Sequence, residues 1–209
     1  MALDLTNSLV QQAIRQLEED KEIKPVQKAL ILMVADESKP ATWQQISSEK
    51  WTEGNKETRI KPERWEELNT IFDALGLVSI TSTRLDDSTF VQPKDGTHQW
   101  IELADMSLSK HPEQANRLAA AIKSGDHREI GLALGFPKSA VDAFMTKELL
   151  PISEWPASTK TISAESMKFL NHMVSKDNWK EEIRYLSGFS KRVKELSEKI
   201  YYECLERQL

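Results

Sequence analysis

The stretch that most constrains the fold is 126–145, where two short helical patterns meet across a Gly-Phe-Pro turn. Asp126 can cap the first helix, and Glu129, three residues later, can complete a capping box. Gly135 stands where a helix ends with positive φ, and Pro137 presets φ for the next helix. The residues expected to face inward are Ile130, Ala133, Leu134, Ala140, Val141 and Phe144. We therefore predict a helix-turn-helix at 126–148.

A second feature is the order of elements between residues 25 and 92. The expected elements are a core helix from Pro25, a short helix capped by Thr42 that holds Trp43 and Ile46, a long helix from Pro62 to Gly76, and strands at 77–82 and 88–92 joined by a turn at 84–87. This order resembles the winged-helix fold. Leu68, Leu75, Gly76 and Leu77 resemble the exit of its third helix, although a polar segment from about 49 to 61 replaces its short turn.

Chain length and turn signals predict two modules. A chain of 209 residues can bury two small cores. The Pro-Lys-Asp-Gly turn at 93–96 and a short strand at 99–103 precede a helical second half, so we expect a boundary near 104–111. The predicted fold class is mostly α with minor β: a winged-helix-like module with an N-terminal helix at 1–104, and an all-helical module at 105–209.

Charge and cysteine content narrow the classes of partner. The net charge of −5 weighs against broad electrostatic binding to nucleic acid, although a local basic face can exist on an acidic protein. Uncharged runs are far shorter than the ~18 residues of a membrane span, and the N-terminus lacks the pattern of a signal peptide. The single cysteine, Cys204, excludes an internal disulfide or a thiolate-rich zinc site. We expect a cytoplasmic protein with no membrane partner.

The 126–148 stretch resembles the helix-turn-helix of bacterial DNA-binding proteins. Gly131, Gly135 and Val141 have the spacing that keeps the two helices of this motif in close contact. The resemblance implies that the second helix faces the major groove with Pro137, Lys138, Ser139, Asp142 and Ala143. The residues that we expect to contact DNA are Arg128, Lys138, Ser139 and Lys147. The alternative is that the motif is only a tight helical corner of the core.

The segment Leu-Gly-Phe-Pro-Lys-Ser-Ala-Val-Asp-Ala-Phe at 134–144 is also similar to a turn in some uncharacterised prokaryotic helical domains. These domains imply no known chemistry. Where such turns contain cysteines, a metal or redox role is conceivable. Ser139 and Ala140 occupy those places here, and this closes the metal and redox alternative.

Titratable residues give no catalytic or metal constellation. His127 lies beside Asp126 and Glu129, but helix capping already explains both acids. The other histidines are isolated in sequence; they are His98, His111 and His172. Cys204 falls on an apolar helical stripe and is expected to be a packed small residue. We therefore predict no catalytic residue, no metal and no cofactor.

The last region, 178–209, is expected to form one or two helices with Gly188 as the break. Its apolar stripe consists of Val193, Leu196, Ile200 and Cys204. Such a stripe either docks on the core of its own chain or forms a surface for a partner or a second copy. Basic residues nearby alternate with glutamates at helical spacing, which favours a self-paired, solvated face.

Two functions follow from these patterns. The first is non-enzymatic DNA binding for transcription regulation, in which cations anchor phosphates of double-stranded DNA and the second helix of the corner reads base edges. The second is a helical protein–protein interaction module without nucleic-acid binding, favoured by the acidic charge and the terminal stripe.

Overall fold

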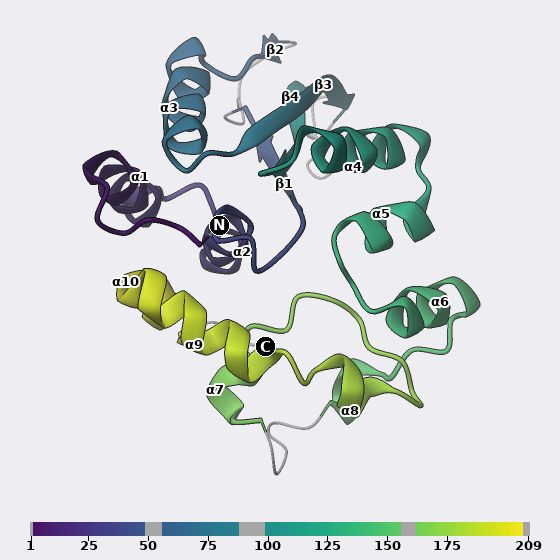
Figure 1. Cartoon of the computed structure of the whole chain (residues 1–209). Helices are drawn as coiled ribbons and strands as arrows, with labels where there is room; N and C mark the ends of the chain where they lie inside the picture. The colour runs from purple at the N-terminus through teal and green to yellow at the C-terminus, as the bar shows by residue number, and fades with distance from the viewer. Residues whose placement is uncertain (1, 49–55, 88–98, 156–161, 207–209) are drawn as a thin grey trace.

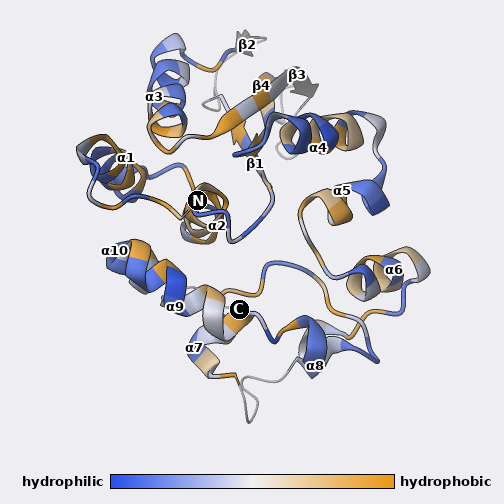
Figure 2. Cartoon of the chain, in the orientation of Figure 1, coloured by the Kyte–Doolittle hydropathy of each residue, from blue (hydrophilic) through white to orange (hydrophobic). Residues whose placement is uncertain are grey.

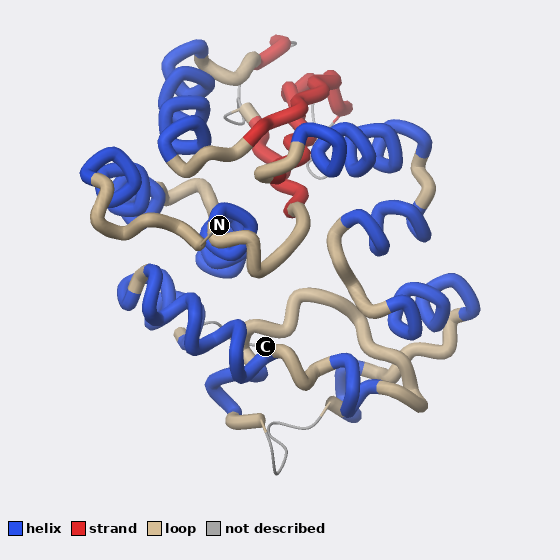
Figure 3. The backbone as a smooth tube through the Cα atoms, in the orientation of Figure 1, coloured by secondary structure: helices blue, strands red, loops and turns tan. Residues whose placement is uncertain are grey.

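Helix α2 (Pro25–Ala35) lies between the sheet and the last two helices (Figure 1, Figure 3). The computed structural model describes residues 2–48, 56–87, 99–155 and 162–206. Most of α2 from Lys28 onward is buried, as expected for a helix that is apolar on nearly all sides. Helix α1 (Ser8–Glu19) packs against α2 and against α3 (Pro62–Ala74). Figure 2 shows orange and blue residues alternating along α1, as in an amphipathic helix.

The sheet is built around β4 (Gln99–Ser109), which pairs on both sides. Strand β3 (Val78–Asp87) runs antiparallel to it from the pair Val78–Ser109 onward, and β1 (Thr42–Ser47) runs antiparallel to residues 103–108. The short β2 (Lys56–Thr58) pairs parallel with the start of β4. The protein is therefore mostly α with a minor sheet, as predicted.

The structure corrects the elements predicted between residues 42 and 92. The expected short helix from Thr42 is strand β1, in which Thr42, Gln44 and Ile46 are buried and Trp43 points outward. The expected turn at 84–87 belongs to β3, and β4 supplies the return strand. The strand predicted at 88–92 lies outside the described residues. Cross-strand pairing with β4 overrides the local helical and turn signals.

The predicted boundary at 104/105 falls inside β4. After this strand, α4 (Pro112–Ser124) packs against β3 and β4 and leads to α5 (His127–Ala133) and α6 (Lys138–Thr146). The remaining elements are a 3₁₀ turn η1 (Ile152–Glu154), α7 (Ala164–Met167), α8 (Trp179–Glu182), α9 (Leu186–Leu196) and α10 (Glu198–Leu205). One hydrophobic cluster joins residues of both predicted modules, from Leu3 to Cys204.

The C-terminal helices dock on the N-terminal half of the same chain. Helices α9 and α10 contact α2, and all four residues of the predicted stripe are buried in the shared core. The stripe is therefore not free for a partner or a second copy. The break between the two helices is at Ser197, whose hydroxyl accepts from the amide of Ile200, whereas Gly188 lies within α9.

The Asp36 carboxylate connects a C-terminal helix to the N-terminal segment, because it pairs with Arg192 and accepts from the amide of Leu3. Arg192 donates to both carboxylate oxygens of Asp36 at 2.5 and 2.8 Å, and the amide of Leu3 donates to the same carboxylate at 3.0 Å. Burial opposes ionisation of Asp36, but these hydrogen bonds outweigh it and lower its pKa to about 2. In the described part of the chain, no helix has the length and apolar character required to cross a bilayer.

Candidate functional site

The corner predicted at 126–148 consists of two short helices, α5 and α6, joined by residues 134–137. The Asp126 carboxylate accepts from the amide of Glu129 at 3.0 Å, which confirms the predicted cap. The capping box is only half formed, because the Glu129 carboxylate accepts from Arg117 at 2.9 Å instead. Gly135 has a φ of 75°, so the predicted left-handed position is confirmed.

Two glycines allow the corner to close. A Cβ atom on Gly131 would lie 2.8 Å from Cγ2 of Val141, and one on Gly135 would lie 2.7 Å from Cγ of Pro40. The first contact joins α5 to α6, as the spacing of these residues predicts. The second brings the corner against the segment that enters β1. A small second core that includes Leu134 lies beneath it.

The inward face of α6 is shifted from the predicted one. Ala140, Val141 and Ala143 are buried, although the resemblance placed Ala143 on the groove-facing side, whereas Phe144 is 47% exposed and Met145 is 51% exposed. The prediction that Phe144 points into the core is therefore wrong. Its ring lies at the rim of a pocket, with an edge contact to the ring of His127 at 6.1 Å between centroids. The corner thus presents large apolar side chains at the surface.

The residues predicted to contact DNA lie on or beside α6. Arg128 donates to Asp142 at 3.0 Å, and Lys138 donates to the other oxygen of the same carboxylate. The hydrogen bonds from Lys138 and then from Arg128 lower the pKa of Asp142. Ser139 is half-buried, and Lys147 is exposed at the C-terminal cap of α6 with a φ of 61°. Two of the four predicted residues, Arg128 and Lys138, therefore lie close together, but both are paired with the Asp142 carboxylate.

Helix α3, the long helix of the winged-helix-like prediction, presents an acidic surface. Its exposed acidic residues are Glu63, Glu66, Glu67 and Asp73. The guanidinium of Arg64 on the same helix is occupied by the buried carboxylate of Asp20 at 2.6 Å. An exposed face of this sign repels phosphate and does not favour a DNA groove.

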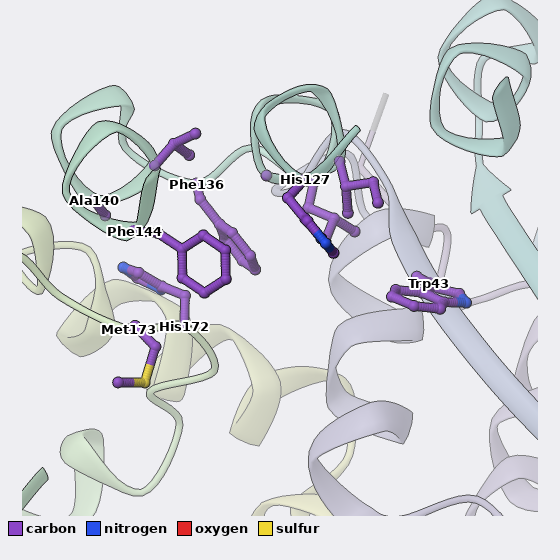
Figure 4. Close-up of a pocket in the computed structure, with 11 residues that line it drawn as sticks. Trp43, His127, Phe136, Ala140, Phe144, His172 and Met173 are labelled. Atoms are coloured by element: carbon purple, nitrogen blue, oxygen red, sulfur yellow. The ribbon is translucent and has the colours of Figure 1, made fainter. Parts of the chain in front are cut away.

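Three adjoining hollows lie at the corner, and all three are lined by Phe136 and His172; we call this set the corner cleft. Its lobes have volumes of about 270, 480 and 240 Å³. Figure 4 shows Phe136 and Phe144 next to His172 and Met173, with Trp43 on the opposite side of the first lobe. These side chains come from β1, from the corner and from the segment between α7 and α8.

His172 is the central polar residue of the corner cleft. It is only 8% exposed, and its ring stacks on Phe136 at 4.9 Å between centroids. Its Nδ1 lies 3.3 Å from the Tyr185 hydroxyl and 3.4 Å from Oδ1 of Asn171, whereas Nε2 is buried without a hydrogen-bond partner among the described residues. Burial, with a further contribution from the charge of Lys39, lowers the pKa of His172 to about 4.

Lys39 brings a positive charge to the same cleft. Its ammonium donates to the carbonyl oxygen of Leu134 and lies 4.9 Å from the centroid of the Phe136 ring. Among the ion pairs of the described residues, none joins Lys39 to an acid. Burial lowers the pKa of Lys39 to about 8, so the amine is still mostly protonated at neutral pH.

The sequence identifies the corner but not the cleft beside it. Lys39 and Trp43 precede the corner by more than 80 residues, and His172 follows it by about 25, so only folding brings them together. His127 lies at the rim of the cleft, exposed, and within the described chain no group of three His, Cys, Asp or Glu side chains is placed to hold a metal ion. The cleft can hold an apolar group, and its polar side chains include those of Lys39 and His172. No protein-family model matches this chain, and no curated protein or solved structure is significantly similar to it.

Proposed function

We propose that this protein is a binding protein rather than an enzyme, and that the corner cleft accepts an apolar group of its ligand. The observation that carries this proposal is the convergence of Trp43, Phe136 and His172, from three distant segments, on one cleft. Small-molecule sites are typically concave, mostly apolar and ~300–1,000 Å³ in volume, with a few polar groups that orient the ligand. The 480 Å³ lobe falls in this range, and Lys39 is one of its polar groups.

The rim of the cleft supports the same proposal. Phe144 lines the first lobe, and it is 47% exposed. An exposed aromatic side chain beside a pocket is typical of binding surfaces, because water is displaced favourably from it. A bound apolar group would cover part of Phe144, which lines the first lobe.

The test is a titration of the ¹⁵N-labelled full chain with 4-phenylbutan-1-ol, an uncharged probe, followed by NMR. The indole N–H of Trp43, which donates to Asp105 at 3.0 Å, reports on the cleft, and the indole of Trp65 on α3 serves as a reference. We expect a saturable shift of the Trp43 resonance, accompanied by that of Trp155, which lines the 480 Å³ lobe, and no shift of the Trp65 resonance. Met173→Trp should fill the cleft and abolish the shift, whereas Leu5→Trp, at a half-buried position outside the cleft, should preserve it. An unmoved Trp43 resonance would overturn the proposal.

DNA binding through α6 is a second candidate. It is favoured by the exposed residues of this helix, with Lys138 at its first turn and Arg128 beside it. Asp142 opposes it, because this carboxylate neutralises one of the two cations that it bridges. If DNA is the partner, removal of the Asp142 charge should free Arg128 and Lys138 for phosphates and strengthen DNA binding.

The second candidate is tested by titration of duplex DNA at several salt concentrations with the wild-type protein and Asp142→Asn. Each additional phosphate contact steepens the dependence of log affinity on log salt by about 0.9. We expect the variant to bind more tightly at low salt, with a slope steeper by up to about 1.8 if both Arg128 and Lys138 engage phosphates. If the variant shows no binding at low salt, DNA is not the partner.

A further inference from the structure

We infer that the ligand of the corner cleft carries a single carboxylate attached to its apolar body, and that this carboxylate binds Lys39 Nζ and His172 Nε2. This inference rests on the proposed function and adds the chemical class of the ligand. Both side chains line the 480 and 240 Å³ lobes, and the apolar side chain of Phe136 also lines both lobes.

The charge balance of the cleft calls for an anion. Lys39 carries a positive charge with one hydrogen bond to a backbone carbonyl and no acidic partner among the described residues. An ammonium group has three donors, so two remain for a ligand. A buried cation without a counter-charge is costly, and a bound carboxylate removes that cost through a charge-assisted hydrogen bond.

His172 supplies a second, independent observation. Its Nε2 atom is buried without a partner in the described structure, which is rare for a polar atom in a native protein. The Tyr185 hydroxyl has one proton, which it can donate to Oδ1 of Asn171 at 3.2 Å or to Nδ1 of His172 at 3.3 Å. In the tautomer whose Nδ1 accepts this proton, Nε2 carries a hydrogen and can donate to a carboxylate oxygen. The carboxylate would therefore satisfy both an unpaired charge and an unpaired donor.

The remaining walls of the cleft define the rest of the ligand. Most are apolar or aromatic side chains, with Leu30, Trp43 and Leu170 on the largest lobe and Phe189 on the smallest; the polar ones include Gln27, Thr42, Ser38 and Asn171. Lys39 is the one cation among the residues that line these two lobes, and a single cation balances a monoanion better than a phosphate, whose charge is greater. The class that fits is a small monocarboxylate with an alkyl or aryl body.

The experiment is isothermal titration of the full chain with three probes that share one body: 4-phenylbutanoate, 4-phenylbutan-1-ol and 4-phenylbutylamine. A charge-assisted hydrogen bond that the alcohol cannot match makes the acid bind about tenfold to a hundredfold more tightly than the alcohol. The amine should bind most weakly, because it brings a second positive charge next to Lys39.

Variants test the two polar contacts separately. Lys39→Met should remove the preference for the acid over the alcohol, whereas Lys39→Arg should retain the preference. His172→Gln keeps a donor near the position of Nε2, whereas His172→Asn does not, so the acid should bind more tightly to the former. Urea unfolding of each variant checks that it is folded before titration.

The outcomes distinguish failure of the carboxylate inference from failure of the proposed binding function. If the acid and the alcohol bind with equal affinity, or if Lys39→Met retains the preference for the acid, the carboxylate inference is wrong while an apolar cleft site remains. If neither probe binds to the wild-type protein, both the inference and the proposed function fail.

Discussion

Substitution of Gly131 by alanine tests the close contact between α5 and α6 that shapes the corner. The added Cβ would lie 2.8 Å from Cγ2 of Val141, which is too close for a carbon–carbon contact. Overpacking of this kind costs roughly 1–3 kcal/mol, whereas alanine is favoured over glycine within a helix by about 1 kcal/mol. We therefore expect a net loss of roughly 0–2 kcal/mol in the free energy of unfolding.

Gly188 provides a matched control because it also lies within a helix, α9, with a negative φ. A Cβ placed there meets nothing within 4 Å. Gly188→Ala should therefore change stability through helix propensity alone and raise the free energy of unfolding by about 0.5–1 kcal/mol. The difference between the two variants isolates the clash at the corner.

Val141→Ala completes a double-mutant cycle. This change removes the methyl groups that the new Cβ would meet, so Gly131→Ala should become neutral or stabilising in its presence. The expected coupling energy is roughly 1–3 kcal/mol, measured by urea unfolding with an unchanged m-value. If the two substitutions are additive, or if Gly131→Ala stabilises as much as Gly188→Ala, the close packing of the corner is refuted.

Three further predictions concern other contacts of the fold, all measured as the free energy of urea unfolding. Gly135→Ala should cost more than roughly 2 kcal/mol, because a left-handed φ and overpacking combine there, whereas Gly125→Ala, with a φ of 70° and open space, should cost only about 1 kcal/mol. The lowered pKa of Asp36 contributes about 2 kcal/mol that is present above pH 3.8 and lost as the pH falls towards 2, and Asp36→Asn should abolish this dependence. Removal of Glu203 by alanine should cost roughly 1–3 kcal/mol because it leaves the buried ammonium of Lys28 without its ion pair, whereas Lys28→Met should be neutral within about 1 kcal/mol. Equal losses from the last two variants would contradict this account.

The corner could be predicted from sequence because its signals are local. Asp126 caps a helix three residues away, and Gly135 ends that helix, so neither prediction depends on distant parts of the chain. The contact between Gly131 and Val141 spans only ten residues, and it too follows from a known spacing. Phe144 was misplaced because its exposure depends on which elements cover α6, and helical periodicity does not determine this.

The sheet was partly missed because polar residues occupy its buried positions. In β1 the inward residues include Thr42 and Gln44, so the alternation of apolar and polar residues that indicates a strand is weak. In β4, Asp105 and Ser107 are buried next to Met106, because neighbours pair with this strand on both sides. Sequence patterning therefore underestimated the length of β4 and placed a boundary inside it.

The candidate site could not be predicted because long-range packing creates it. His172 has no sequence neighbour that indicates a ligand site, and Lys39 reads as part of a loop before Pro40. Their relevance depends on burial and on contact with Phe136, which appear only when the corner docks against the segments before β1 and after α7. The packing of the C-terminal stripe could not be predicted either. Docking on α2 and docking on a partner require the same pattern of apolar residues, so the sequence does not distinguish them.

The most direct test of the corner cleft as a ligand site is the location of bound 4-phenylbutanoate on the ¹³C-labelled protein by isotope-filtered NMR. The account predicts nuclear Overhauser contacts from the phenyl ring of the probe to Phe136, Trp43 and Met173. Contacts that instead involve exposed apolar residues outside the cleft, such as Leu9 or Tyr202, would contradict it.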